Sequence, residues 1–370
     1  MQMDWAVTWL KDSKQDVAEV RRLLGLDPGD YLPPQSLIDR LAKLADDTRA
    51  AVITDQQIEA LDLPTHETPA KGRAPGDAIN WRTILLPLLD QRGLVKALPL
   101  ELFENTQGQL SAALELALKP LRLEPEARAR SLEKLGKLLL AGHDRQLRLI
   151  EGLTQEMVNL PMDRTQVVVR WAGTSVYELL SAVLQTDADI SPTASLLEQI
   201  RSLLRHAQAA LHVRLGTSVL RLFLVHPEWL GAKGGTALSW ASFYLLGRYS
   251  QWLGSQGQAE EALLGYFIAA NPVKARLKNK ALRSAVNDEA AEALANLLGW
   301  SVQEVSRLFQ ELPQGRACSM AEVDWIWRCQ GASKASGMTA ADVLAATALH
   351  ADSAPAAWQA VGEAAVAASR

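Results

Sequence analysis

The sequence predicts an all-α fold, a multi-helix array of stacked antiparallel helix pairs arranged in two lobes. Apolar residues recur three and four positions apart through most of the 370 residues, which is the period of an amphipathic helix. Glycine follows several of these stripes, and serine or threonine precedes the next one, as expected where helices end and begin. One short segment, 166–171, has the valine-rich run of a strand but no partner of similar character, so we interpret it as helix.

An N-terminal helical unit is predicted over residues 1–63. Its apolar stripes define helices that begin near Trp5, Val17 and Leu37 and after the cap residue Thr54. Over 64–77 the composition changes to Pro, Thr, Lys and Gly without apolar periodicity. We interpret this segment as a loop or linker and place a unit boundary there.

The main helical unit is predicted over residues 78–370, with a further sub-boundary near 186–194. Its longest stripe follows one helix face through Leu132, Leu135, Leu139, His143, Leu147, Ile150 and Leu153. The chain has eleven tryptophans, and at helical spacing we expect them in the core more often than at a ligand. A last short helix is expected at 354–368.

Segment 288–349 shows the helix starts and stops most clearly. Gly299 is expected to end one helix, and Ser301 to cap the next, with Glu304 at the spacing of a capping box. The same order recurs in Gly337, Thr339 and Asp342. This segment is typical of packed helix pairs and contains no recognisable chemistry.

The composition is that of a globular protein and argues against several classes. The net charge is -4 and the pI is about 5.9, whereas nucleic-acid binders usually carry a basic excess. Cys318 and Cys329 lack the spacing of a zinc or redox motif and are expected to be buried or half-buried thiols. No apolar run is long enough to span a membrane, and we see no conventional secretory signal at the N-terminus.

The sequence offers no catalytic, cofactor-binding or metal-binding residues, and we predict neither an enzyme nor a cofactor. His143 has no second ligand at metal spacing, and His206 and His212 lie six positions apart on different helix faces. The glycine-rich segment 231–236 lacks the Gly-Lys-Ser/Thr order of a phosphate-binding loop. We expect charged residues to be solvated on helix faces, among them the basic cluster 274–283 and the isolated acids Glu133, Glu151 and Asp324.

Residues 297–308 have the pattern of a DNA-binding helix-turn-helix, which would place Gln303, Ser306 and Arg307 in a major groove. The acidic neighbours Glu304 and Glu311 and the negative net charge oppose this interpretation. Looser forms of the same pattern recur around Gly25, Gly216 and Gly337. A repeated packing unit explains all of them, and we expect no duplex binding at physiological salt.

A series of short motifs follows Arg201 in a recognisable order. They are His206-Ala207-Gln208, Leu220-Arg221-Leu222-Phe223, His226-Pro227-Glu228-Trp229-Leu230-Gly231, Leu238-Ser239, Arg248-Tyr249-Ser250-Gln251-Trp252-Leu253, Leu297-Leu298-Gly299-Trp300, Val323-Asp324-Trp325 and Ala356-Ala357-Trp358-Gln359-Ala360. Weaker upstream matches are Ile53-Thr54, Trp81, Ile150-Glu151 and Trp171-Ala172. In this order and spacing the chain resembles the helical shell of the A component of the bacterial Tc (toxin complex) insecticidal toxins.

The resemblance implies a structural role. In that family the A component is a very large chain that assembles as a pentamer, with a mostly helical shell around a translocation channel. The present chain resembles part of the shell only. The implied partners are therefore other parts or protomers of an A component, with no nucleic acid and no membrane insertion by this segment. The implied location is cytoplasmic before release and extracellular afterwards, without a conventional signal peptide.

Two alternatives stay open at this point. One is a stand-alone helical adaptor or chaperone for a secreted effector, which would also act through protein–protein packing. The other is a helix-turn-helix DNA-binding protein that uses residues 297–308.

Overall fold

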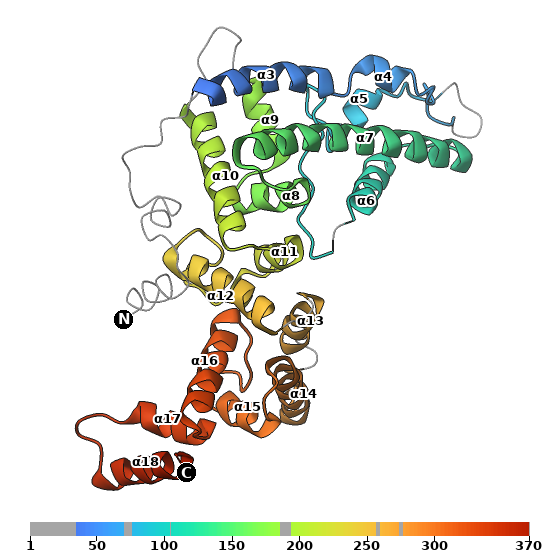
Figure 1. The fold of residues 1–370 in the computed structure, drawn as a ribbon. Coiled ribbons are helices and arrows are strands. Elements are labelled where there is room, and N and C mark those ends of the chain that lie inside the picture. Colours follow the sequence, from blue (N-terminus) through green and yellow to red (C-terminus); the bar gives the residue numbers. More distant parts are fainter. Residues whose placement is uncertain are drawn as a thin grey trace. The chain divides into compact units, whose positions relative to one another are not determined.

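The predicted all-α fold is confirmed by the computed structural model, which describes residues 35–69, 76–103, 105–185, 194–256, 260–273 and 277–369. These residues form helices joined by turns and loops, with two isolated β-bridges and no strand among them (Figure 1). The valine-rich segment 166–171 is helical, as interpreted. The helices expected near Trp5 and Val17, and most of the sub-boundary at 186–194, lie outside the described residues.

The described residues belong to two compact units, which we call the N-terminal unit (35–212) and the C-terminal unit (213–369). They divide between His212 and Val213, whereas the sequence analysis placed its boundary at 64–77. The described parts of that segment lie inside the N-terminal unit. There the Glu67 N–H donates to the Asp77 carbonyl at 2.9 Å, and the Thr68 N–H donates to the Arg122 carbonyl at 2.7 Å.

The N-terminal unit is organised around its longest helix, α7. Its helices are α3 (Gln35–Ala51), α4 (Asp55–Glu59), α5 (Trp81–Ile84), α6 (Thr106–Leu118), α7 (Pro125–Val158), α8 (Met162–Trp171), α9 (Val176–Leu184) and α10 (Ala194–His212). Helices α3, α6, α8, α9 and α10 all pack against α7 (Figure 1). The start of α7 follows from Pro125, since proline fits the first helical turn, and its end from Asn159, which takes a left-handed conformation.

The buried face of α7 matches the predicted stripe at Leu135, Leu139, Ile150 and Leu153 but differs from it in the middle of the helix. Gly142 and Gln146 are buried on it, where the sequence analysis expected His143 and Leu147, which are only half-buried. A Cβ at position 142 would lie 2.7 Å from the Cδ1 of Ile53, so glycine allows that close approach. Gly142 is thus buried because it is small, and Gln146 is buried because its side chain has a hydrogen-bond partner.

His206 is buried in α10 and has no charged partner of opposite sign in the described structure. Its ring meets Trp171 edge-on with centroids 5.0 Å apart, and its Nδ1 lies 2.7 Å from the Ser202 carbonyl oxygen. A carbonyl oxygen can only accept, so Nδ1–H is the donor in this contact. Burial lowers the pKa of His206 from its usual 6.5.

We expect the N-terminal unit to lose stability as the pH falls below about 6.5. The unfolded chain takes up a proton on His206 near that pH, whereas the folded chain resists protonation, so the loss continues down to the lowered pKa. The slope contributed by one proton is at most about 1.4 kcal/mol per pH unit. Urea unfolding near pH 7.5 and pH 5.5 measures this loss. A His206→Gln variant with the same pH dependence would contradict the assignment.

The C-terminal unit is a succession of helix pairs. Its elements are α11 (Thr217–Val225), the 3₁₀ turn η1 (Pro227–Trp229), α12 (Trp240–Gln256), α13 (Glu260–Ala270), α14 (Lys280–Leu298), α15 (Val302–Phe309), α16 (Met320–Ser336), α17 (Ala340–Ala348) and α18 (Pro355–Ala368). The pairs that pack together are α11 with α13, α13 with α14, α14 with α15, α15 with α17, α12 with α16, α16 with α17 and α17 with α18 (Figure 1). The expected final helix is present as α18.

Most of the predicted helix ends in the C-terminal unit are confirmed. Gly299 and Gly337 end α14 and α16 in the left-handed conformation, with φ of 57° and 73°. Thr339 and Asp342 form the capping box at the start of α17. Ser301 caps α15 as expected, through its Oγ and the Gln303 N–H at 3.2 Å.

The capping box predicted between Ser301 and Glu304 is wrong. Glu304 points to another helix, where its Oε2 accepts a hydrogen bond from the Ala340 N–H at 2.6 Å. Ala340 is the first residue of α17, so this carboxylate satisfies a free amide at a helix N-terminus that also favours negative charge. Glu304 therefore connects α15 to α17.

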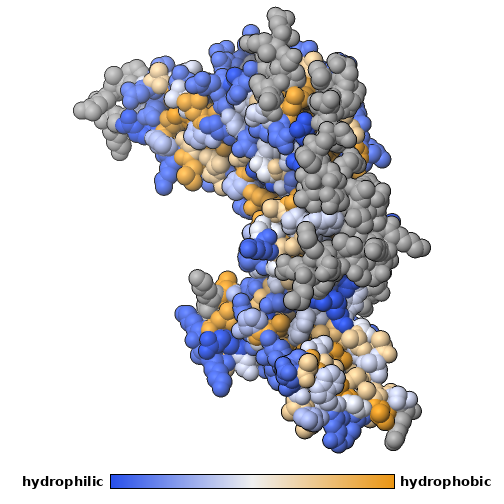
Figure 2. All heavy atoms as spheres, turned by 90° about the vertical axis from the view of Figure 1, so that its left-hand side faces the viewer, coloured by the Kyte–Doolittle hydropathy of each residue, from blue (hydrophilic) through white to orange (hydrophobic). Residues whose placement is uncertain are grey.

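The surface of the described residues carries both hydrophobic and hydrophilic side chains. On the face drawn in Figure 2, hydrophobic residues are interspersed among hydrophilic ones wherever the atoms are not grey. Among the described residues, no single helix has both the length and the apolar composition needed to cross a membrane. Helices α8 and α9 meet those criteria together, as a pair bent by 81°.

Candidate functional site

The main polar centre of the C-terminal unit is Asp324, which the sequence analysis wrongly expected to be solvated. Asp324 is 1% exposed, in α16. Its carboxylate accepts hydrogen bonds from Arg248 Nε at 2.6 Å, Tyr244 Oη at 2.9 Å and Arg328 Nε at 3.1 Å. Arg248 and Tyr244 belong to α12, so this carboxylate connects the two helices.

Arg248 makes the shortest of these hydrogen bonds to Asp324 and has further contacts of its own. Its guanidinium carbon lies 3.9 Å from the centroid of the Trp327 ring, a cation–π contact, and its Nη1 donates to Gln251 Oε1 at 2.9 Å. Two guanidinium groups face one buried carboxylate, which compensates the charge of Asp324. Burial, with the nearby carboxylate of Asp324, raises the pKa of Tyr244, which keeps its hydroxyl a donor.

We call such a set of contacts between two helical segments a joint, and the Asp324 contacts are the first. A second joint connects the His226–Gly231 motif to the start of α16. The His226 ring stacks on Trp229 at a centroid distance of 3.8 Å, and the Leu230 carbonyl accepts from the Ala321 N–H at 3.2 Å. Gly231 has a φ of 77°, and a Cβ there would lie 2.7 Å from the Cβ of Ala321. Only glycine fits this approach without a shift of the backbone.

A third joint holds the loop that precedes α16 in place through hydrogen bonds. The buried Arg316 donates through Nε to the Ala270 carbonyl at 2.6 Å and through Nη1 to Asn287 Oδ1 at 3.0 Å. The Tyr266 hydroxyl donates to the Ala317 carbonyl at 2.7 Å. Together these bonds connect the loop to α13 and α14.

The Leu297–Trp300 motif is also connected to α16. The buried Gln330 donates through Nε2 to the Leu298 carbonyl at 2.9 Å. Leu298 is the last residue of α14, so its carbonyl has no hydrogen-bond donor within its own helix. Motifs that carried the resemblance in the sequence are therefore helix–helix joints in the C-terminal unit.

Both cysteines are as buried as expected. Cys318 is buried and Cys329 half-buried, and neither forms a disulfide. Burial raises the pKa of Cys318 to about 11, which keeps its thiol protonated. The Cys318 Sγ lies 3.8 Å from the Ala270 carbonyl oxygen, beside the Arg316 joint. Cys318 is therefore a structural thiol.

The other side chains singled out in the sequence do not converge on one another. His143 is half-buried, and its Nδ1 lies 3.3 Å from the adjacent Asp144. Glu133 is exposed and its pKa is lowered by a hydrogen bond from Lys137, whereas partial burial raises the pKa of Glu151. Within the described residues no group of three or more His, Cys, Asp or Glu side chains could hold a metal ion.

The helix-turn-helix pattern corresponds to α14 and α15, and its contacts are made within the protein. The Arg307 Nη1 donates to Glu311 Oε1 at 2.7 Å and to Gln310 Oε1 at 3.3 Å. Glu304 bonds to α17, as described above. The buried residues of α15 are Val305, Leu308 and Phe309.

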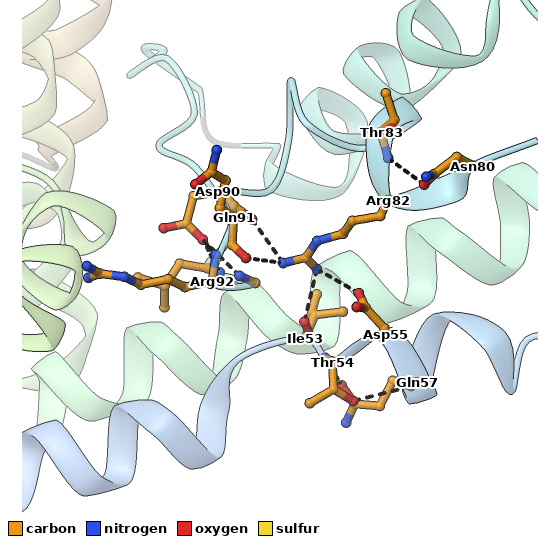
Figure 3. A network of polar contacts seen from close by, with 12 residues as sticks. Ile53, Thr54, Asp55, Gln57, Asn80, Arg82, Thr83, Asp90, Gln91 and Arg92 are labelled. Atoms are coloured by element: carbon orange, nitrogen blue, oxygen red, sulfur yellow. Dashed lines mark hydrogen bonds and ion pairs between the residues drawn. The ribbon is translucent and has the colours of Figure 1, made fainter.

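A polar network in the N-terminal unit joins three chain segments at Arg82 (Figure 3). Its guanidinium donates to the carbonyls of Gln91 at 2.8 Å, Asp90 at 3.1 Å and Ile53 at 3.3 Å. The Asp90 carboxylate in turn accepts from the backbone N–H groups of Arg92, Gly93 and Leu94 at 2.8–2.9 Å. The segments before α4 and after α5 are thereby fixed side by side.

These features define a class of protein: an all-α multi-helix protein in whose described residues buried polar groups connect neighbouring helices. No protein-family model matches the chain. The chain is 28% identical over 213 residues to "Toxin subunit YenA1" of Yersinia entomophaga, an alignment that covers 55% of this chain and 18% of that relative. The chain thus matches less than a fifth of the relative's length. It is related to a Tc toxin subunit at the level of a distant homologue.

Proposed function

We propose that the chain is a structural helical-shell segment of a Tc-type toxin A component, which supports assembly of a toxin-translocation complex through protein–protein packing. The observation that carries the proposal is the similarity to a toxin subunit over 55% of the chain. The described joints are consistent with it, because Asp324, Arg316 and Gln330 use their polar atoms to connect helices.

The proposal extends to partners, chemistry and location. The partners are other parts or protomers of an A component, and the segment itself contacts no nucleic acid and does not enter a membrane. It has no catalytic role and needs no cofactor. It leaves the cell within a toxin complex, after residence in the cytoplasm.

Assembly is tested by measuring the mass of the purified chain, alone and mixed with a channel-bearing polypeptide of a Tc-type A component. We expect the 40.4 kDa chain to move into a heavier complex, because shell segments pack on other parts of the assembly. An unrelated protein of similar size and charge is the control. A chain that stays at its own mass in the mixture, or that binds a secreted effector in preference to the channel-bearing polypeptide, would contradict the proposal.

A further inference from the structure

A groove in the N-terminal unit lies beside α4 and the segment that leads into α5. Its volume is about 690 Å³, which is within the range of sites that hold small ligands or peptide side chains. Its apolar lining comes from Ile58, Leu63, Ile79 and Trp81. Trp81 is half-buried and fixed, since its Nε1 donates to the Pro64 carbonyl at 2.9 Å. A bulky apolar side chain could pack on this rigid floor.

Carboxylates surround the apolar floor. Asp55, Glu59 and Asp62 line the groove and are exposed, and the one basic residue of the lining is Arg82, so the lining carries a net negative formal charge. Glu59 and Asp62 have no hydrogen-bond or ion-pair partner for their carboxylates among the described residues. Asp55 lies 3.7 Å from Arg82 Nη1.

The nearby cations are engaged with backbone carbonyls. Arg82 donates to the carbonyls of three residues in the network of Figure 3. The Lys134 Nζ, from α7, donates to the Leu61 carbonyl at 2.5 Å and lies 3.4 Å from the Asp62 carbonyl. These bonds hold both cations on the main chain, and the Glu59 and Asp62 carboxylates stay available to a ligand.

We propose that this groove binds a segment of a protein partner in which a lysine or arginine stands beside a bulky apolar residue. The apolar side chain packs on the half-buried Trp81 and Ile79, and the cationic group reaches Glu59 and Asp62. Charge complementarity selects this occupant, because an acidic segment would face unpaired carboxylates and an uncharged one would leave them unused. The inference rests on the groove alone and is independent of the proposed toxin role.

The full chain is titrated into a fluorescein-labelled hexapeptide of alternating leucine and lysine, and binding is followed by fluorescence anisotropy. We expect saturable binding that weakens as salt is raised, since the rim carboxylates are exposed. The Glu59→Gln/Asp62→Asn double variant removes two charges, and asparagine tolerates the φ of 48° at position 62. It should bind at least about fivefold more weakly.

The matched control is Glu101→Gln/Glu115→Gln, which removes the same charge from exposed residues of the same unit away from the groove. It should bind the peptide as the unsubstituted chain does. Absence of binding by the unsubstituted chain, or equal loss in both double variants, would overturn the proposal. Equal binding of a leucine–glutamate hexapeptide would overturn it as well. So would complete displacement of the probe by spermidine, a polycation without an apolar side chain, because the leucines would then contribute nothing to binding.

Discussion

Substitution of Gly93 by alanine is expected to unfold the segment that joins α4 and α5 to the core of the N-terminal unit. Gly93 has a φ of 96°, and a Cβ there would lie 2.1 Å from the Ile53 carbonyl oxygen, which is a backbone atom and cannot swing away. The Gly93 carbonyl also accepts from the Ile53 N–H at 2.8 Å, so the two segments cannot separate without losing that bond. Backbone strain and overpacking together cost at least about 3 kcal/mol.

Gly136→Ala is the matched control for Gly93→Ala. Gly136 lies within α7, and a Cβ there meets nothing within 4 Å. Alanine should therefore stabilise the helix by up to about 1 kcal/mol. Hydrogen exchange of peptides that cover 53–58 and 90–95, with urea unfolding of both variants, measures the difference. Equal protection of these peptides in the two variants would show that the close approach at Gly93 carries little free energy.

Substitution of Asp324 by asparagine is expected to destabilise the C-terminal unit by about 3 kcal/mol, because it leaves the guanidinium group of Arg248 without its counter-charge. Arg248 is nearly buried, with 13% of its side chain exposed, so water replaces the lost carboxylate poorly. Arg328 is 41% exposed and contributes less. Peptides from α12 and α16 should lose hydrogen-exchange protection together, since Asp324 connects these helices.

Glu311→Gln provides the comparison for Asp324→Asn. It also removes one carboxylate from an arginine pair of the C-terminal unit, but Glu311 and Arg307 are both exposed. The loss should stay below about 0.5 kcal/mol. If the two variants unfolded at the same urea concentration, burial of Asp324 would not have the energetic role assigned to it.

Most helices of this fold follow from the sequence because their apolar stripes are also their packing faces. Helix ends can be predicted equally well where they depend on neighbouring residues only. Examples are the left-handed cap at Gly337 and the capping box at Thr339. Glu304 shows the limit of local signals. Its spacing from Ser301 fits a capping box, but the Ala340 N–H, 36 residues further along, competes for the same carboxylate.

Hydrophobicity alone also misplaces part of the core. Gln146 is buried because its Oε1 accepts from the Val95 N–H at 3.1 Å, a partner 51 residues away. No pattern within α7 reveals that bond, so an apolar stripe through His143 and Leu147 is the natural prediction.

The polar centre at Asp324 could be predicted only in part. Arg328 stands four residues after Asp324, which indicates a local ion pair on a helix face. Burial depends on Arg248 and Tyr244, which lie 76 and 80 residues away in α12. The sequence does place Arg248 and Asp324 within motifs of the Tc resemblance, and their proximity in the structure gives these motifs a physical reason.

Helix α7 has a consequence for how the N-terminal unit loses its structure. At about 1.5 Å per residue its 34 residues extend for about 50 Å, and five other helices pack against it. Any of those helices that detaches exposes part of the α7 surface, and α7 cannot unfold as a whole without depriving each of them of a neighbour. Melting of this unit is therefore a collective event, and a protease cut inside α7 leaves no piece with a complete core of its own.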